Sequence, residues 1–154
     1  MAMELEFRLV TEMDLPVLRE LYALMDGEEP LAEAVVDRLF AEISAVPNYD
    51  IYLAELDGIA VGTFALLMMP TMMHRGFHRS AVVDAVAVHP EYRRRGIGRS
   101  LMEEALRLSR EARCYKLMLS SNLLRVDAHL FYERLGYEQH GWSYSLTLSE
   151  QLDS

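Results

Sequence analysis

Cysteine is almost absent from the sequence, in which Cys114 is the single thiol among 154 residues. One cysteine cannot form an internal disulfide, which excludes the class of small disulfide-stabilised secreted domains. The first residues lack the basic and apolar regions of a signal peptide. The longest apolar stretch, residues 59–69, is too short to span a bilayer. We therefore expect a cytoplasmic protein that does not bind a membrane.

Positive charge is also scarce, since 15 lysines and arginines face 24 acidic residues and the net charge is -9. A surface of this sign repels phosphate backbones, so a general nucleic-acid binder is excluded. Low-complexity linkers and internal repeats are absent, and 51% of the residues are hydrophobic. A domain of this size can bury about 70% of its unfolded surface. We expect one globular domain over residues 1–154.

The clearest local pattern lies in residues 82–108, which read VVDAVAVHPEYRRRGIGRSLMEEALRL. Residues 82–88 hold four valines and two alanines, with Asp84 as the single charge, which predicts a central strand buried on both faces. Pro90 ends this strand. After Gly98, apolar residues recur at steps of four and three, which predicts a helix packed on the core. The residues of this stripe are Leu101, Ala105, Leu108 and Ala112.

Periodicity elsewhere predicts an α/β (α+β) domain, in which a mixed central sheet of about six to seven strands is flanked by four helices. Asp57-Gly58 between two apolar runs indicates a hairpin turn. The central strand, its helix and the next apolar run should form a right-handed unit with parallel strands, and ligands usually bind at the open end of such a pair. The other expected strands are 7–10, 51–56, 59–69, 115–121, 137–140 and 142–148. The other expected helices are 31–45, 127–135 and one that starts at a capping box of Thr11 with Asp14 and ends at Gly27.

The loop that enters the helix has the composition of an anion site. Unpaired amides and a partial positive charge mark a helix N-terminus, and glycine lets an anion approach the backbone. No Gly-Lys-Ser/Thr follows as in a Walker loop, and Leu101 stands where a dinucleotide fingerprint needs its third glycine. What remains is Arg93-x-x-Gly96-Ile97-Gly98, for which phosphate is the expected ligand.

That pattern resembles the pyrophosphate loop of the GNAT family of N-acetyltransferases, whose form is Gln/Arg-x-x-Gly-x-Gly/Ala. A second stretch, Asn122-Leu-Leu-Arg125-x-Asp-Ala-His-x-Phe131-Tyr132 followed by Gly-Tyr, resembles the family motif Asn-x-x-Ala-x-x-Phe-Tyr-x-x-x-Gly-Phe/Tyr. The order of expected elements is also that of the family over the whole chain. The tail looks most like the branch containing aminoalkylphosphonate N-acetyltransferases. The usual asparagine falls at Arg125, while Asn122 lies three residues earlier.

The resemblance implies a transferase that uses acetyl-CoA as cosubstrate. Its pyrophosphate is expected on the main-chain amides of residues 94–99, with arginine side chains reaching the outer phosphates. Pantetheine is expected along the central strand, where main-chain groups also hold the thioester oxygen. The implied cosubstrate residues are Val86, Ala87, Val88, Arg93, Arg94, Arg95, Gly96, Ile97, Gly98, Arg99, Asn122, Ala128 and Phe131.

Acetyl transfer to an amine needs a base for the ammonium group and an acid for the departing thiolate. Tyr132 matches the family tyrosine that protonates the CoA sulfur, and it can also pack its ring in the core beside Phe131. Asp84 is the lone charge of an apolar strand, so it either acts as the base through a water or belongs to a structural ion pair. Without a bulge, Asp84 would share a strand face with Val86 and Val88.

The segment 70–79 is expected to be a loop over the site. Its cationic side chains contrast with the acidic chain, and arginine binds carboxylate, phosphonate or phosphate through two parallel hydrogen bonds. An amine substrate that also carries an anion would explain them; solvation of an exposed loop, or pairing with acidic groups, is the alternative. The two histidines lack a third ligand, so no metal is expected. The candidate substrate residues are His74, Arg75, His78 and Arg79.

Three functions fit these patterns. The first is an N-acetyltransferase for the primary amine of a small molecule. The second is a protein or peptide N-acetyltransferase, since an acidic chain would attract basic peptides. The third is a non-catalytic regulatory domain that binds CoA; the intact glycine loop and Tyr132 favour an enzyme. Assembly as a homodimer is left open.

Overall fold

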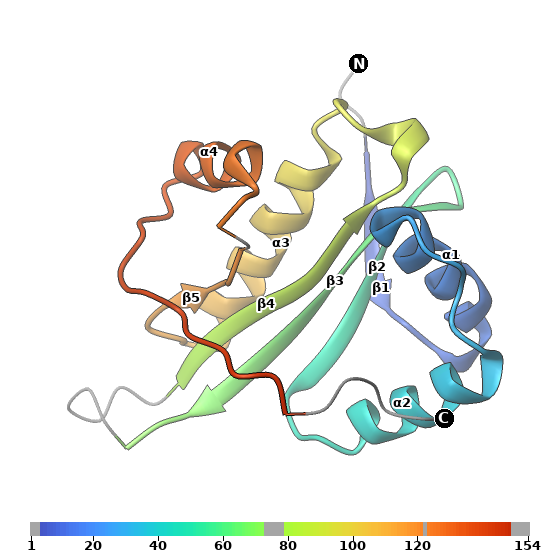
Figure 1. The fold of residues 1–154 in the computed structure, drawn as a ribbon, viewed down its shortest axis with the longest axis horizontal. Helices are drawn as coiled ribbons and strands as arrows, with labels where there is room; N and C mark the ends of the chain where they lie inside the picture. The colour runs from blue at the N-terminus through green and yellow to red at the C-terminus, as the bar shows by residue number, and fades with distance from the viewer. Residues whose placement is uncertain (1–3, 73–78, 122, 149–154) are drawn as a thin grey trace. The chain divides into compact units, whose positions relative to one another are not determined.

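The computed structural model describes residues 4–72, 79–121 and 123–148 (Figure 1). The chain forms two compact units, Met1–Met118 and Leu119–Ser154. The expectation of one domain over residues 1–154 stays a prediction. Of the helices in these described ranges, none is long and apolar enough to cross a membrane.

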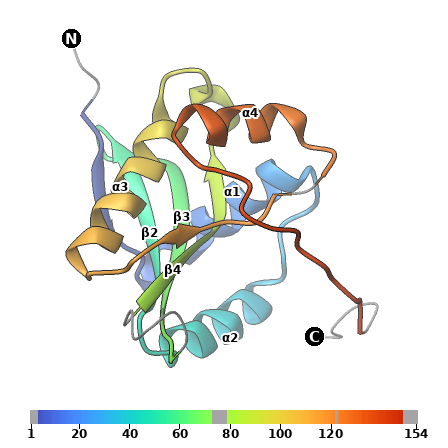
Figure 2. The ribbon, with the colours of Figure 1, turned by 90° about the vertical axis from the view of Figure 1, so that its left-hand side faces the viewer.

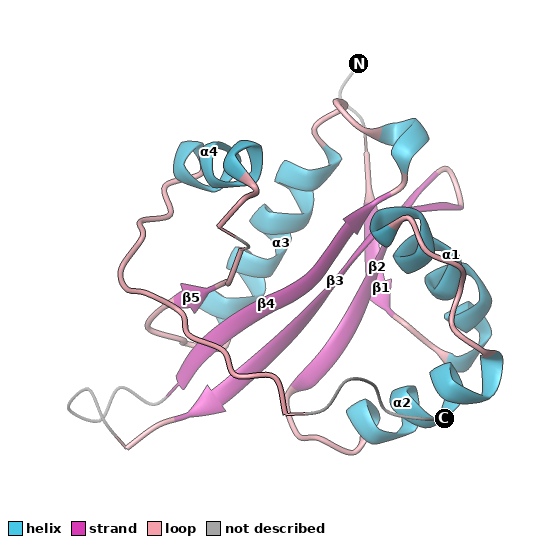
Figure 3. Cartoon of the chain, in the orientation of Figure 1, coloured by secondary structure: helices cyan, strands magenta, loops and turns pink. Residues whose placement is uncertain are grey.

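The first unit is built on a five-stranded mixed sheet with the strand order β1-β2-β3-β4-β5 (Figure 3). The first four strands pair antiparallel, and β5 runs parallel to β4. In the β2–β3 turn, Asp57 and Gly58 have φ values of 51° and 79°, which both fall in the left-handed region that a tight hairpin requires. The strands are β1 (Glu6–Leu9), β2 (Tyr49–Leu56), β3 (Ile59–Pro70), β4 (Arg79–Val88) and β5 (Leu117–Met118).

Helices cover both faces of this sheet (Figure 2). On one face lie α1 (Leu15–Asp26) and α2 (Glu33–Ser44), and on the other lies α3 (Ile97–Glu111). Under α1, the buried core consists of Val10, Leu15, Leu18, Leu21, Ile51, Leu53 and Ala65. Under α3, it includes Ile97, Leu101, Met102 and Ala105. The predicted strand–helix–strand unit and the predicted stripe on its helix are thus confirmed, although Leu108 and Ala112 are only half-buried.

An ion pair fixes the entry to α1. The guanidinium of Arg8 donates to both carboxylate oxygens of Asp14 at 2.7 Å, and the Thr11 amide donates to the same carboxylate at 2.7 Å. Asp14 is buried, but the Arg8 guanidinium and the Thr11 amide compensate the charge of its carboxylate. The hydrogen bonds from Arg8 lower the pKa of Asp14 to about 2.

We expect this pair to make the protein sensitive to acid. Because the pKa of Asp14 is lower in the folded chain than its ordinary value of 3.8, its stabilisation is present above pH 4 and is lost as the pH falls toward 2. Asp14→Asn should lower the free energy of unfolding by about 1.5–3 kcal/mol at pH 7, the range for hydrogen bonds to charged groups. Urea titrations at several pH values measure the difference, which should shrink below pH 4; the exposed Asp26→Asn is the control. A difference that does not depend on pH would contradict this role.

The second unit contains α4 (Val126–Arg134). The predicted strands at 137–140 and 142–148 are wrong for the structure, in which residues 123–148 form no strand. The alternating apolar side chains of that segment stay exposed instead, because a strand pattern supplies no pairing partner by itself. They are Trp142, Tyr144, Leu146 and Leu148. The described chain therefore has five strands where six to seven were predicted, and the last of them, β5, is short. The α/β class and the four helices are confirmed.

Candidate functional site

The loop between β4 and α3 presents main-chain amides at a helix start. A short 3-10 turn, η3 (Pro90–Tyr92), leads into residues 93–96, which we call the arginine loop. Arg94 and Gly96 have φ values of 63° and 80°, and left-handed residues in such a turn can direct successive amides into an anion-binding concavity. The first intrahelical bond joins the Ser100 amide to the Gly96 carbonyl at 3.0 Å, so the amides before it are available to a ligand.

The start of α3 is held against the sheet by close packing. Ile97 is 1% exposed and Leu101 is fully buried. A Cβ atom added to Gly62 of β3 would lie 3.1 Å from Leu101 Cδ1, 3.2 Å from the Ala87 carbonyl oxygen and 3.4 Å from Ile97 Cγ2. Gly62 therefore allows α3 to approach the strands closely. Sequence reasoning missed this residue, although a glycine inside a strand pattern is the signal for such an approach.

Gly62→Ala should move the start of α3 or strain its packing. Overpacking of a core typically costs about 1–3 kcal/mol, and we expect the free energy of unfolding to fall by that amount. Denaturant titration measures it. The control is Gly141→Ala, because a Cβ at Gly141 meets no atom within 4 Å. Equal stability of the Gly62→Ala variant and the wild type would show that this contact is not needed.

The arginine side chains of the loop differ in their partners. Arg93, Arg94 and Arg95 are exposed, and none of them has an ion pair to another described residue. Arg99, in the first turn of α3, pairs with Glu103 at 2.9 Å. The loop is thus a locally positive feature on an acidic chain.

A bulge interrupts β4 just before the arginine loop. Asp84 lies opposite Ala65 of β3, and Ala87 lies opposite Thr63, so two residues of β4 oppose one of β3. Within the bulge, Ala85 has a φ of 48°, which is uncommon for a residue other than glycine.

This bulge corrects the expected faces of β4. Thr63 and Ala65 are two apart on β3, so Asp84 and Ala87 share a face, and Val88, opposite Gly62, lies on the other. The expectation that Asp84 and Val88 share a face applies only to a regular strand. Val86 has no partner in the register.

The free edge of β4 lies beside the arginine loop. In the first unit, β5 pairs with β4 only at Ala81 and Val82. From there to Val88, the edge of β4 that faces away from β3 carries main-chain groups that no strand of this unit engages. Such an edge can accept an extended ligand through main-chain hydrogen bonds.

Asp84 lies on the α1 side of the sheet, opposite Ala65 of the core under α1. Its side chain is exposed, and none of the salt bridges in the described chain includes it. Tyr22 of α1 packs against the same core and hydrogen bonds with the Thr63 side chain. Burial raises the pKa of Tyr22 to about 12, the hydrogen bond with Thr63 partly opposes this, and the negative charge of Asp84 adds to the increase, so the phenol stays neutral.

The second unit brings the second motif together around α4. The rings of Phe131 and Tyr132 meet edge to face at 5.2 Å, and Tyr137 contacts the Tyr132 ring at 6.0 Å. Burial raises the pKa of Tyr132, and the charge of Arg125 partly opposes this. Tyr132 therefore keeps its proton at neutral pH.

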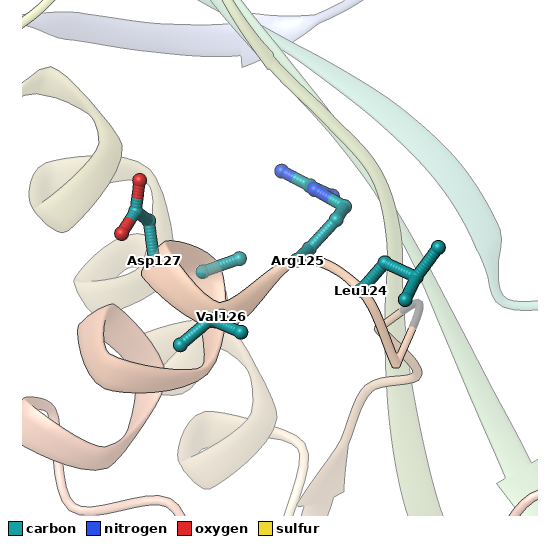
Figure 4. Close-up of a pocket in the computed structure, with 5 residues that line it drawn as sticks. Leu124, Arg125, Val126 and Asp127 are labelled. Atoms are coloured by element: carbon teal, nitrogen blue, oxygen red, sulfur yellow. The ribbon is translucent and has the colours of Figure 1, made fainter.

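Arg125 stands at the N-cap position of α4 and lines an open pocket. Its side chain and that of Asp127 project from the same side of the chain, while Val126 points away (Figure 4). Leu124 and Ala128 complete the lining. Asn122, the other candidate for the motif asparagine, lies outside the described residues.

Three of the four predicted substrate residues, His74, Arg75 and His78, also lie outside the described residues. Arg79 begins β4, and its carbonyl accepts a hydrogen bond from the Tyr115 amide at 2.9 Å.

Burial raises the pKa of the Cys114 thiol, although the charge of Arg79 opposes this increase, so this cysteine is not an activated nucleophile. In the parts of the chain that are described, no group of three or more His, Cys, Asp or Glu side chains is placed to hold a metal ion.

Comparison with known proteins identifies relatives over most of the chain. Residues 15–137 match the family model described as Acetyltransferase (GNAT) family. Glucosamine 6-phosphate N-acetyltransferase of Trypanosoma brucei brucei is 28% identical over 139 residues, which cover 89% of this chain and 91% of that protein. Aminoalkylphosphonate N-acetyltransferase of Salmonella typhimurium is 32% identical over 102 residues, which cover 66% of this chain and 65% of that protein. A solved structure of a Trypanosoma brucei acetyltransferase superimposes with a TM-score of 0.79 at 26% identity, covering 94% of this chain and all of that one.

Proposed function

The chain belongs to the GNAT acetyltransferase family and is an acyltransferase, and we propose that it moves the acetyl group of acetyl-CoA to the primary amine of a small molecule that also carries an anion. The observation that carries the proposal is the position of the arginine loop directly after the free edge of β4. The loop offers amides and arginines to a pyrophosphate, and the edge offers main-chain groups to a pantetheine arm. Family members use acetyl-CoA as cosubstrate, which fits both features.

In this proposal, the residues that bind the acyl donor fall into three groups. Main-chain groups of Val86, Ala87 and Val88 hold pantetheine and the thioester oxygen. The pyrophosphate lies on the amides of residues 94–99, and the side chains of Arg93, Arg94, Arg95 and Arg99 surround it. The second unit contributes Ala128 and Phe131, with Asn122 or Arg125 in the role of the motif asparagine.

Asp84 is the proposed base. A primary amine with an ordinary pKa near 10 is mostly protonated at pH 7, so the ammonium must lose a proton before its nitrogen attacks the thioester. An exposed carboxylate without an ion pair to another described residue suits this role, directly or through a water, better than a structural one. The attack forms the N–C bond, and collapse of the tetrahedral intermediate breaks the C–S bond.

The Asp84→Asn variant should lose activity in a way that depends on pH. General-base catalysis typically contributes about 10²–10⁴-fold, and we expect kcat/KM at pH 7 to fall by at least tenfold. Near pH 10 much of the amine is already neutral, so the deficit should shrink there. Initial rates from pH 6.5 to 10 measure this, with Asp50→Asn on β2 as the control. If Asp84→Asn lowered the folding stability, and its loss of kcat/KM were the same at every pH, a structural role for Asp84 would be favoured.

Tyr132 is the proposed acid for the leaving thiolate. A phenol that burial keeps protonated can donate its proton as the C–S bond breaks. Packing against Phe131 and Tyr137 fixes the ring and is compatible with this role.

The acceptor is proposed from the chemistry in the names of the relatives. Glucosamine 6-phosphate and aminoalkylphosphonates both combine an amine with a phosphorus oxyanion. Cationic side chains at His74, Arg75, His78 and Arg79 would bind such an anion through charge-assisted hydrogen bonds. Small anionic amines are therefore proposed in preference to neutral amines and polyamines.

An amine screen with thiol detection tests this function. Purified protein is incubated with acetyl-CoA and one acceptor at a time: aminoalkylphosphonates, glucosamine 6-phosphate, amino acids, neutral amines, spermidine and a basic peptide. Faster thiol release with the anionic amines is expected. The best rate with the basic peptide would instead support a protein N-acetyltransferase, and CoA binding without turnover of any acceptor would support a regulatory domain.

A further inference from the structure

An aromatic ring and a cation stack at the start of the arginine loop. The guanidinium carbon of Arg95 lies 5.1 Å from the centroid of the Tyr92 ring, within the range of a cation–π contact. The imidazole of His89 meets the same ring edge to face at 5.6 Å. Neither Tyr92 nor His89 is part of the motif that identified the loop.

Hydrogen bonds tie this stack to the sheet. The His89 amide donates to the carbonyl of Val61, a fully buried residue of β3, at 2.8 Å. The Tyr92 amide donates to the His89 carbonyl at 2.9 Å, and the Glu91 amide donates to His89 Nδ1 at 3.2 Å. These bonds fix the backbone around the stack, and the edge-to-face contact with His89 orients the Tyr92 ring.

An aromatic ring and a carboxylate restrain an arginine side chain in different ways. Arg99 is paired with Glu103, which neutralises its charge and competes with a phosphate for its donors. The Tyr92 ring restrains Arg95 while leaving the guanidinium charged and its N–H groups available in the plane of the group. An exposed arginine loses side-chain rotamer entropy when a ligand fixes it, so prior restraint favours binding.

We propose that Tyr92 is a positioning residue for the acyl donor, because its ring holds Arg95 ready to bind a phosphate group of CoA. The inference rests on the proposed function, which supplies the ligand. It assigns no chemical step to Tyr92.

A double-mutant cycle on CoA affinity tests the proposal. Calorimetric titration of CoA is carried out on the wild type, Tyr92→Leu, Arg95→Leu and the double variant. A cation–π contact at an exposed site contributes about 0.5–1 kcal/mol, so Tyr92→Leu should raise the Kd by about 2- to 5-fold. In the Arg95→Leu background the same change should have no further effect.

Three further variants separate positioning from general packing. Tyr92→Phe keeps the ring face and should restore the affinity lost in Tyr92→Leu. Tyr115→Leu removes another cation–π contact, with Lys116 at 5.2 Å, and should leave the Kd unchanged. If Tyr92→Leu does not fold, Tyr92→Gln replaces it in the cycle.

Two results would overturn the inference. One is that Tyr92→Leu and Tyr92→Phe bind CoA with the same affinity. The other is that Tyr92→Leu causes the same loss of CoA affinity in the wild type and in the Arg95→Leu background. Failure of the proposed donor site gives a different result, because the wild type itself would then not bind CoA. A wild type that binds CoA but acetylates no acceptor would contradict the proposed transferase function and leave this inference standing.

Discussion

Gly98→Asp is expected to abolish measurable CoA binding while leaving the protein folded. Gly98 lies in the first turn of α3, where the main-chain amides have no intrahelical acceptor and can bind an anion. An aspartate there places a side chain and a negative charge where the pyrophosphate must touch the backbone. Repulsion and lost contacts should together weaken CoA affinity by about two orders of magnitude or more, which is about 3 kcal/mol.

The fold should survive because a carboxylate in the first turn of a helix is favourable for the helix itself. Gly98→Asn is the matched control, since it adds nearly the same volume without the charge and should lose less affinity. Calorimetric titration with CoA, after circular dichroism has verified the fold, measures both variants. Unchanged affinity in folded Gly98→Asp protein would remove the loop from the donor site.

Tyr132→Phe is expected to lower kcat by about 10- to 1000-fold with little change in the KM for acetyl-CoA. The proton of the phenol is needed only as the thiolate leaves, so its removal raises the barrier without weakening ground-state binding. Phenylalanine keeps the edge-to-face contacts with Phe131 and Tyr137. Steady-state kinetics on the best acceptor gives the two constants.

The neighbouring Tyr137→Phe is the control for this variant, because burial raises its pKa as well, to about 12, and its ring lies in the same cluster. It should keep kcat within a few-fold of the wild type. Wild-type turnover in Tyr132→Phe would leave Tyr132 with a packing role alone.

The sequence was sufficient to predict the arginine loop and the strand and helix on either side of it. The valine-rich run, the glycines and the stripe that begins at Leu101 are local patterns, and each of them formed the predicted element. The Asp57-Gly58 turn was equally local. Such features depend on residues close in sequence, for which periodicity and turn chemistry suffice.

Other features depend on tertiary contacts that a single sequence does not encode visibly. The bulge at Ala85 carries no glycine or proline to mark it, so the face of Asp84 relative to Val88 was predicted for a regular strand. The alternating segment 142–148 has the composition of a strand but no partner in the described structure. Likewise, the charge of Asp84 influences the pKa of Tyr22 only because α1 packs against β3 and β4.

The most direct test of the central proposal is acetyl transfer to a matched pair of acceptors. Purified protein is given acetyl-CoA with either aminoethylphosphonate or ethylamine, and CoA thiol and the acetylated amine are quantified together over time. We predict equal amounts of CoA and N-acetylated product, formed at least tenfold faster with the phosphonate, and no product with Gly98→Asp. Release of no thiol with either acceptor, or equal rates with both, would contradict a transferase for anionic amines.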